Sequence, residues 1–175
     1  MKFIKLAKKR CSIRTYSTQT VEQEVLDRIL EAGRLAPSAV NYQPWTMLVV
    51  REEEGKKKLH AIYKREWFQT APMYIVVCAE HTQSWKRRAD GMDHADVDVS
   101  ILTEHLCLAA AEEGLGTCIV CNFDPASFKE AFPLPEGTEP VVILPIGYPA
   151  DPSIFEQTPK KRKPLSDIVK YESYV

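Results

Sequence analysis

Four short apolar runs constrain the fold of this chain more than any other feature. They are Trp45–Val50, Met73–Ala79, Thr117–Val120 and Glu139–Tyr148. Aliphatic and β-branched residues dominate these runs, which are too short for typical helices and therefore predict β-strands. Helical periodicity fills the sequence between them, at about residues 3–9, 20–36, 52–63, 96–114 and 124–132. The chain is therefore expected to combine a sheet with packed helices.

Local signals mark where several of these helices begin and end. Thr20–Gln23 has the pattern of a capping box, in which a hydroxyl and an amide three positions apart satisfy the first backbone N–H groups. The second helix is expected to start there and to stop before Pro37. Asp124 is expected to cap the last helix. The long helix over 96–114 carries a wide apolar stripe, which fits either a dimer core or a buried helix of a monomer.

The size and charge of the chain argue against several classes of protein. With 175 residues, it is expected to form one domain over residues 1–175. A net charge of −1 argues against nucleic-acid binding through bulk electrostatics, and the apolar runs are too short to cross a bilayer. The first residues do not resemble a signal peptide, and five scattered cysteines fit a reducing compartment. We therefore expect a cytoplasmic protein that interacts with neither nucleic acid nor membrane.

Two polar segments carry the candidate chemistry. Arg10, Ser12 and Arg14 alternate along the chain, so an extended backbone would point them to one side. Guanidinium groups supply paired N–H donors and a permanent charge, which together with a serine hydroxyl suit a phosphate. The segment Ala36–Trp45 places small and amide side chains in a turn, where they can hydrogen-bond the edge of a planar heterocycle. Phosphate and heterocycle together describe a nucleotide-like cofactor.

The two segments together resemble the FMN-dependent nitroreductase family. That family typically carries Arg-Arg-Ser-Ile-Arg followed by an aromatic residue, and Ala-Pro-Ser-x-x-Asn-x-Gln-Pro-Trp after its next helix. In this chain Cys11 stands at the second arginine, and the aromatic residue, Tyr16, comes one position later. Gly114–Asp124 is a third match. Its Gly-x-Gly ends a helix and leads into a strand, whereas a Rossmann fingerprint opens a helix.

The resemblance implies a fold and a set of cofactor contacts. The implied fold is α+β, with a central mixed, mostly antiparallel sheet flanked by helices. The implied cofactor is FMN, with NADH or NADPH as the electron donor. The residues implied to bind FMN are Arg10, Cys11, Ser12 and Arg14 in the first segment, Pro37, Ser38, Asn41 and Gln43 in the second, Cys121 and Asn122 in the third, and Lys160 and Arg162 near the C-terminus.

The family assigns these segments to different parts of the cofactor. The first segment is implied to hold the phosphate together with Arg162, with Lys160 as the second candidate, although from its residues alone this basic stretch is more simply a solvated linker. The second segment is implied to reach the ribityl chain or ring from the partner subunit. The backbone around Cys121 and Asn122 is implied to lie against flavin N5 and donate a hydrogen bond to it.

The C-terminal residues 149–175 are rich in proline and lysine and are expected to have little regular structure of their own. A segment of this length without its own core must be disordered or must dock on another surface. The resemblance implies that it wraps a partner subunit, which gives an obligate homodimer with two FMN sites at the interface.

Other reactive residue types fit structural roles better than catalytic ones. A zinc site at Cys118 and Cys121 would need a second ligand pair, which the sequence lacks, and a dithiol site would place them at a helix N-terminus. The other three cysteines are expected to fill the core. His94 and the nearby acids fit a helix N-terminus better than a metal site. We therefore expect no metal and no catalytic acid or base.

The expected function is that of an FMN-dependent NAD(P)H oxidoreductase. It would reduce nitro compounds, quinones or similar small-molecule acceptors by ping-pong hydride transfer through flavin N5. Residues 63–98 are expected to select the acceptor, with Trp85 either facing the substrate or anchoring this loop. Two alternatives stay open. One is a non-catalytic flavin-binding dimer that acts as a carrier or sensor; the other is a nucleic-acid module built on the basic tail, against which the net charge argues.

Overall fold

The computed structural model describes residues 2–157 and 160–174. Thr158, Pro159 and Val175, which belong to the predicted C-terminal extension, lie outside the described residues. The helices are α1 (Phe3–Lys9), α2 (Gln23–Arg34), the 3₁₀ turn η1 (Ala39–Asn41), α3 (Glu53–Ile62), α4 (Glu66–Gln69), α5 (Ala95–Glu112), α6 (Pro125–Ala131), α7 (Ile154–Gln157) and α8 (Leu165–Ile168). The strands are β1 (Trp45–Val50), β2 (Met73–Glu80), β3 (Gly116–Thr117) and β4 (Thr138–Gly147).

The four strands form one antiparallel sheet in the order β1-β2-β4-β3. β2 lies between β1 and β4, with Trp45 of β1 opposite Ala79, and its register against β4 shifts after Val77. Among the described residues, parallel pairing is limited to an isolated bridge between Ser12 and Thr117. The expected α+β fold with a mostly antiparallel sheet is therefore confirmed.

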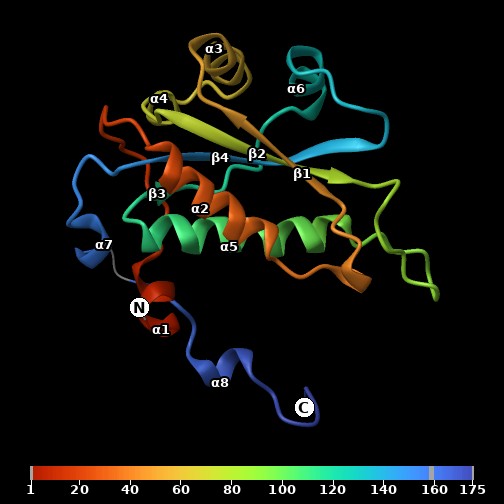
Figure 1. Ribbon diagram of the computed structural model, residues 1–175. Helices are drawn as coiled ribbons and strands as arrows, with labels where there is room; N and C mark the ends of the chain where they lie inside the picture. The colour runs from red at the N-terminus through yellow and green to blue at the C-terminus, as the bar shows by residue number, and fades with distance from the viewer. Residues whose placement is uncertain (1, 158–159, 175) are drawn as a thin grey trace.

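Helices cover both faces of the sheet (Figure 1). α2 and α5 lie on one face, and α3, α4 and α6 lie on the other. Because successive side chains of a strand alternate between faces, Ile75 and Val77 of β2 pack with α2 and α5. Tyr74 and Val76 of the same strand pack with the aromatic and aliphatic residues of the opposite layer. The central strand is thus buried from both sides.

The predicted cap of α6 and the end of α2 before Pro37 are confirmed, but the predicted capping box at the start of α2 is wrong. The Asp124 carboxylate accepts hydrogen bonds from the N–H groups of Ala126 and Ser127, which caps α6 as expected. α2, in contrast, begins at Gln23 after an extended Glu22, without a side-chain cap. Val21 is buried in the core and comes before the helix, and not in its first turn as the capping box predicted.

The strand predicted over Thr117–Val120 is shorter than expected. β3 ends at Thr117, and pairing resumes at Val120, which exchanges hydrogen bonds of 3.1 and 2.9 Å with Ile143 of β4. Between the residues of β4 that pair with Thr117 and with Val120 lies Pro145, which has no backbone N–H to donate. The proline therefore interrupts the ladder that the apolar pattern predicted.

α5 presents apolar residues on two sides. Leu102 and Leu106 are fully buried against the sheet layer. On the other side, Val97 is 44% exposed. It lines a surface hollow of about 790 Å³ together with Ile101 and residues of α1. One side of the stripe is therefore a monomer core, and the other side is an apolar surface that the described residues leave uncovered.

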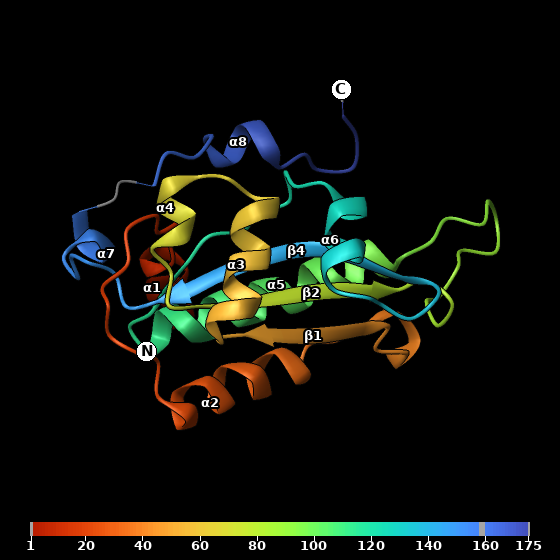
Figure 2. The ribbon, with the colours of Figure 1, turned by 90° about the horizontal axis from the view of Figure 1, so that it is seen from above.

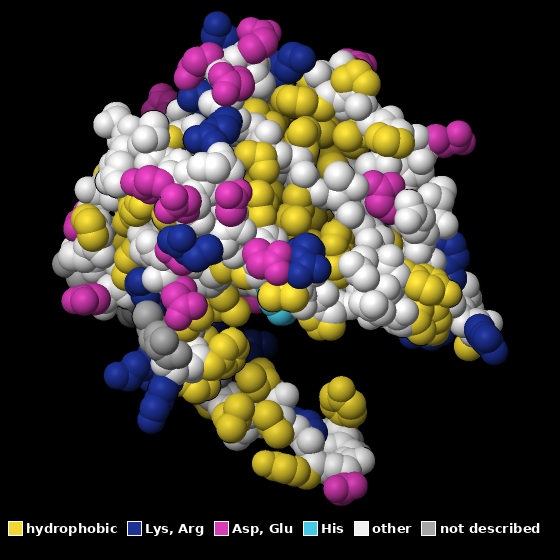
Figure 3. Space-filling model, viewed as in Figure 1, with side chains coloured by type: hydrophobic (Ala, Val, Ile, Leu, Met, Phe, Trp, Pro, Cys, Tyr) yellow, Lys and Arg dark blue, Asp and Glu magenta, His cyan; other side chains and the backbone are white. Residues whose placement is uncertain are grey.

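The C-terminal extension projects from the rest of the molecule (Figures 1 and 2). It contains two short helices, α7 and α8, where little regular structure was expected. From α8 onward its large side chains have little cover, since Leu165 is 70% exposed and Tyr171 is 83% exposed. Figure 3 shows hydrophobic side chains along this projecting arm. Within the described chain, no helix is long and apolar enough to cross a membrane.

Candidate cofactor site

The first polar segment lies beside the third. Ile13 donates a backbone hydrogen bond to the carbonyl of Thr117 at 2.9 Å, and Ser12 forms the parallel bridge to the same residue. Cys11 and Ile13 are buried, which leaves Arg10, Ser12 and Arg14 on the other side of the strand-like segment. The predicted alternation is therefore confirmed. Because the Cys11 thiol points into the core, this residue can offer a ligand only its backbone.

The side chain of Arg10 lies in a strongly basic environment. Lys160 donates a hydrogen bond from Nζ to the Arg10 carbonyl, whereas Arg162 is exposed and donates to the Lys161 carbonyl at 2.8 Å. The structure thus places Lys160, rather than Arg162, against Arg10. Burial, and after it the charge of Arg10, lowers the pKa of the Lys160 ammonium. Arg10 Nε lies 4.0 Å from Glu104 Oε1 of α5, so one carboxylate faces the two positive charges of Arg10 and Lys160 at this end of the site.

Arg14 points to a different group from Arg10. Its guanidinium carbon lies 5.6 Å from the centroid of the Trp67 ring in α4, a cation–π contact. Both residues line a cavity of about 320 Å³ together with Tyr63, Arg65 and the segment Cys118–Asn122. The aromatic residues of this cavity, Trp67 of α4 and Tyr63 in the turn before it, fall within residues 63–98, which the sequence analysis expected to select the acceptor.

Cys118 and Cys121 point in different directions, as expected of residues in a strand-like run. Cys118 is buried and Cys121 is exposed, and neither forms a disulfide within the described chain. Burial raises the pKa of both thiols, so neither is a reactive thiolate. The segment therefore contributes an exposed backbone and an apolar wall, and not a redox pair.

The second polar segment forms a tight loop with an unusual backbone. Val40, Asn41 and Gln43 have φ values of 48°, 60° and 51°, in the left-handed region. The Ser38 hydroxyl oxygen accepts a hydrogen bond from the Gln43 N–H at 2.9 Å, and the Gln43 amide donates to the Asn41 side-chain oxygen at 3.3 Å. These bonds leave the Ser38 O–H and the Asn41 NH₂ available as donors. Pro37 is exposed next to them.

Within one chain, the loop over 38–43 and the first polar segment, over 10–14, lie far apart. The loop contacts Asp98 in the first turn of α5, whereas Ile13 packs on Gly116, beyond the last turn of that helix. From Asp98 to the end of α5 at Glu112 the helix rises by about 20 Å. Figures 1 and 2 show the loop before β1 and the segment after α1 at opposite ends of α5.

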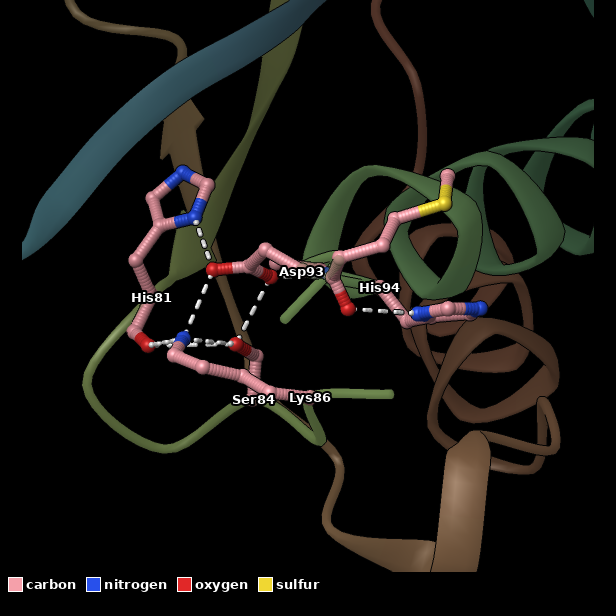
Figure 4. Close-up of polar contacts among 7 residues, drawn as sticks. His81, Ser84, Lys86, Asp93 and His94 are labelled. Atoms are coloured by element: carbon pink, nitrogen blue, oxygen red, sulfur yellow. Dashed lines mark hydrogen bonds and ion pairs between the residues drawn. The ribbon is translucent and has the colours of Figure 1, made fainter. Parts of the chain in front are cut away.

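A second polar cluster joins the two sides of the hairpin over 81–94 (Figure 4). Asp93 accepts hydrogen bonds from Ser84 at 2.7 Å and Lys86 at 2.8 Å, and its carboxylate lies 3.0 Å from His81 Nδ1. The Ser84 hydroxyl bonds to the acid and not to the imidazole, so this is no nucleophile–base pair. The described residues contain no His, Cys, Asp and Glu group that could hold a metal. The cluster therefore rigidifies the hairpin.

Trp85 lies in the same hairpin as an anchor. Its ring packs edge-on against His94, with centroids 4.7 Å apart, and the side chain is half-buried. The segment over 81–94, which its polar sequence predicts as a loop or lid, is a hairpin loop with one isolated bridge between Lys86 and Asp93.

Comparisons with known proteins agree on one family. Residues 7–67 and 60–148 match the family model described as the nitroreductase family. The chain is 31% identical over 180 residues to a Bacillus subtilis (strain 168) protein named FMN reductase (NAD(P)H), which covers 94% of this chain and 71% of that protein. A crystal structure described as a nitroreductase family protein from Clostridium difficile 630 is 41% identical, with a TM-score of 0.88 over 99% of both chains. A protein from Exiguobacterium sibiricum 255-15, solved in complex with FMN, is 24% identical with a TM-score of 0.83 over 98% of both chains, which shows a shared fold.

Proposed function

The chain belongs to the nitroreductase family, and from this we propose that it is an FMN-dependent NAD(P)H oxidoreductase that acts on small planar acceptors such as nitro compounds or quinones. The observation that carries the proposal is the arrangement of the first and third segments. Arg10 and Lys160 form a basic end, and Arg14 lines a cavity with the exposed backbone of Cys121 and Asn122. The names of the similar proteins, which include an FMN reductase, support the same cofactor.

The donor set of the site fits FMN. Burial, and after it the positive charge of Arg10, lowers the pKa of Lys160, and a phosphate next to both residues would offset that charge. The cavity beside Arg14 offers apolar walls, an aromatic ring and backbone groups, which are the contacts that a planar heterocycle requires. The free donors of Ser38 and Asn41 match the hydroxyl and carbonyl oxygens of a ribityl chain or ring.

The protein side chains in this site would bind and orient and would not transfer protons. When bound, FMN would supply the redox chemistry: it would carry two electrons as a hydride from NADH or NADPH to the acceptor, which would take its second proton from water. Arg10 and Lys160 would fix the phosphate, while Arg14 and the 121–122 backbone would fix the ring. We assign no catalytic acid or base, because the nearest thiols have raised pKa values and the only histidine–acid cluster lies in the hairpin over 81–94 of the described chain.

We further propose that the site is completed by a second copy of the chain. The loop that carries Ser38 and Asn41 is about 20 Å from the first segment along α5, so one chain cannot use both on one cofactor. The outer side of α5 and the arm after Lys163 expose apolar side chains, as an interface between two copies requires. A homodimer with FMN at its interface accounts for both observations.

One experiment separates the proposed reductase from a non-catalytic flavin carrier or sensor. The absorbance spectrum of the purified protein, loaded with FMN if necessary, is recorded anaerobically before and after addition of NADH and then NADPH. A reductase loses its flavin absorbance near ~450 nm on addition of at least one of the two and regains it with an acceptor such as a quinone. A protein that binds FMN but keeps its absorbance with both donors would be the carrier, and one that binds no FMN would contradict both.

A further inference from the structure

Asp98 is a buried carboxylate that the proposed function does not use. It lies in the first turn of α5 and is 2% exposed. Its Oδ1 accepts a hydrogen bond from the backbone N–H of Ala39 at 2.9 Å. Its Oδ2 is buried and has no hydrogen-bond partner in the described chain. A buried carboxylate with one free oxygen costs stability unless it performs a task, because an apolar residue would fill the space at lower cost.

The backbone that Asp98 holds is strained. Val40 follows Ala39 directly and has a left-handed backbone (φ 48°), which a β-branched residue rarely adopts. The other hydrogen bonds of residues 38–43 are local. They lie within the loop, such as that from the Asn41 N–H to the Ser38 carbonyl at 3.0 Å, or join it to Trp45, the first residue of β1. Among the described residues, the hydrogen bond from Ala39 to Asp98 is the one hydrogen bond that joins this loop to a distant element.

We propose that Asp98 is a positioning residue for the cofactor: it holds the 38–43 loop in the strained conformation that presents the Ser38 hydroxyl and the Asn41 amide as donors. This inference rests on the proposed function, because those two donors serve FMN. A carboxylate suits the task, since a hydrogen bond from a backbone N–H to a charged acceptor is stronger than one to a neutral acceptor. The strain at Val40 is then part of the binding geometry and is balanced by the bond to Asp98.

Thr103 provides a matched control on the same helix. It is also 2% exposed, and its hydroxyl is also buried without a hydrogen-bond partner in the described residues. Among the described residues, it makes no hydrogen bond to the 38–43 loop. Thr103→Val therefore removes a buried polar atom from α5 without touching the loop, and it reports the effect of a general change in the core.

The test measures the dissociation constant of FMN from FMN-free protein by flavin fluorescence. Asp98→Ala should weaken FMN binding by about tenfold or more, because the loop loses a charge-assisted hydrogen bond. Asp98→Asn keeps an oxygen that can accept from Ala39 and should stay within about threefold of the unmodified protein. Thr103→Val should bind FMN as the unmodified protein does. Hydrogen exchange of residues 38–43 in FMN-free protein should be faster in Asp98→Ala and unchanged in Thr103→Val.

A second variant tests the same bond from the other partner. Ala39→Pro removes the donor N–H, and Ser38 before it already has the extended backbone (φ −137°, ψ 164°) that a residue before proline needs. Ala39→Pro should weaken FMN binding as much as Asp98→Ala does. The variant with both substitutions should bind FMN no more weakly than either single variant. If Asp98→Ala does not fold, Ala39→Pro carries the test.

The possible outcomes are distinct. FMN binding that is unchanged in Ala39→Pro, or lost equally in Thr103→Val, would overturn the positioning role. Asp98→Asn as weak as Asp98→Ala would also overturn it, because keeping an acceptor for the Ala39 N–H would then have no effect. If the unmodified protein binds no FMN, the proposed function itself fails, and this inference fails with it.

Discussion

Gly116 and Ile13 are so close that no side chain is possible at position 116: a Cβ there would overlap with Cγ1, Cβ and Cγ2 of Ile13. This contact joins two segments that lie about a hundred residues apart in the sequence. It lets Ile13 bury fully and lets its N–H reach the carbonyl of Thr117 at 2.9 Å. Gly116 therefore allows the first polar segment, over 10–14, to lie beside residues 118–122, which line the cavity.

Gly116→Ala should destabilise the protein by about 1–3 kcal/mol, since the neighbouring atoms belong to a buried β-branched side chain that cannot move away easily. The free energy of unfolding from urea titration measures the effect. Ile13→Ala opens the space, so the same glycine substitution should cost clearly less in that background. Additive losses in the double variant would show that the two residues do not constrain each other.

Arg10 and Arg14 should contribute differently to flavin binding, because Arg10 lies with Lys160 and Arg14 lies against Trp67. Arg10→Gln should weaken the binding of FMN by about tenfold or more and hardly affect riboflavin, which has no phosphate. Arg14→Gln should weaken both flavins to a similar degree. Lys161→Gln removes an exposed cation nearby and serves as the control. An equal loss of both flavins in Arg10→Gln would place the phosphate elsewhere.

Asp93 should make the hairpin over 81–94 sensitive to acid. Burial alone would raise the pKa of this carboxyl, but hydrogen bonds led by that from Lys86 outweigh it and lower the pKa below its ordinary value. The stability from this group is therefore complete above the unfolded-state pKa of about 4 and decreases as the pH falls below it. Asp93→Asn should cost about 2 kcal/mol at pH 7 and progressively less below pH 4.

The measurement for Asp93 is urea unfolding at several pH values. Asp96→Asn, which removes an exposed carboxylate three residues further along the chain, in the first turn of α5, is the control and should show little of this pH dependence. A cost of Asp93→Asn that stays constant from pH 7 to pH 3 would contradict the assignment.

Removal of residues 164–175 should dissociate the proposed dimer. This arm exposes Leu165, Ile168, Tyr171 and Tyr174, which only another surface can cover. The truncated chain should sediment as a monomer at concentrations at which the full chain is a dimer, and it should lose most of its FMN. Lys170→Gln, which keeps the apolar residues, should remain dimeric. A truncated chain that stays dimeric would place the interface on α5 alone.

Much of the fold and of the site could be predicted because it depends on neighbouring residues. The alternation of Cys11 and Ile13 with Arg10, Ser12 and Arg14 predicted which of them are buried, and the structure agrees. The Asp124 cap, the long α5 and the strands β1, β2 and β4 also follow from short-range patterns, since capping, helical periodicity and β-propensity all act within a few residues. The cofactor class came from the spacing of segments that resemble a known family.

The remainder was decided by contacts between residues that are distant in the sequence. α2 begins at Gln23, after the buried Val21, and not at the predicted capping box, and Pro145 of β4 interrupted the strand after Thr117. No local pattern indicates that Trp67 lies over Arg14 or that Asp98 holds Ala39. The sequence by itself determined which groups can hold a cofactor. Only the packing of α5 and the sheet determined which groups meet, because burial and backbone pairing across the whole chain outweigh the small preferences of single residues.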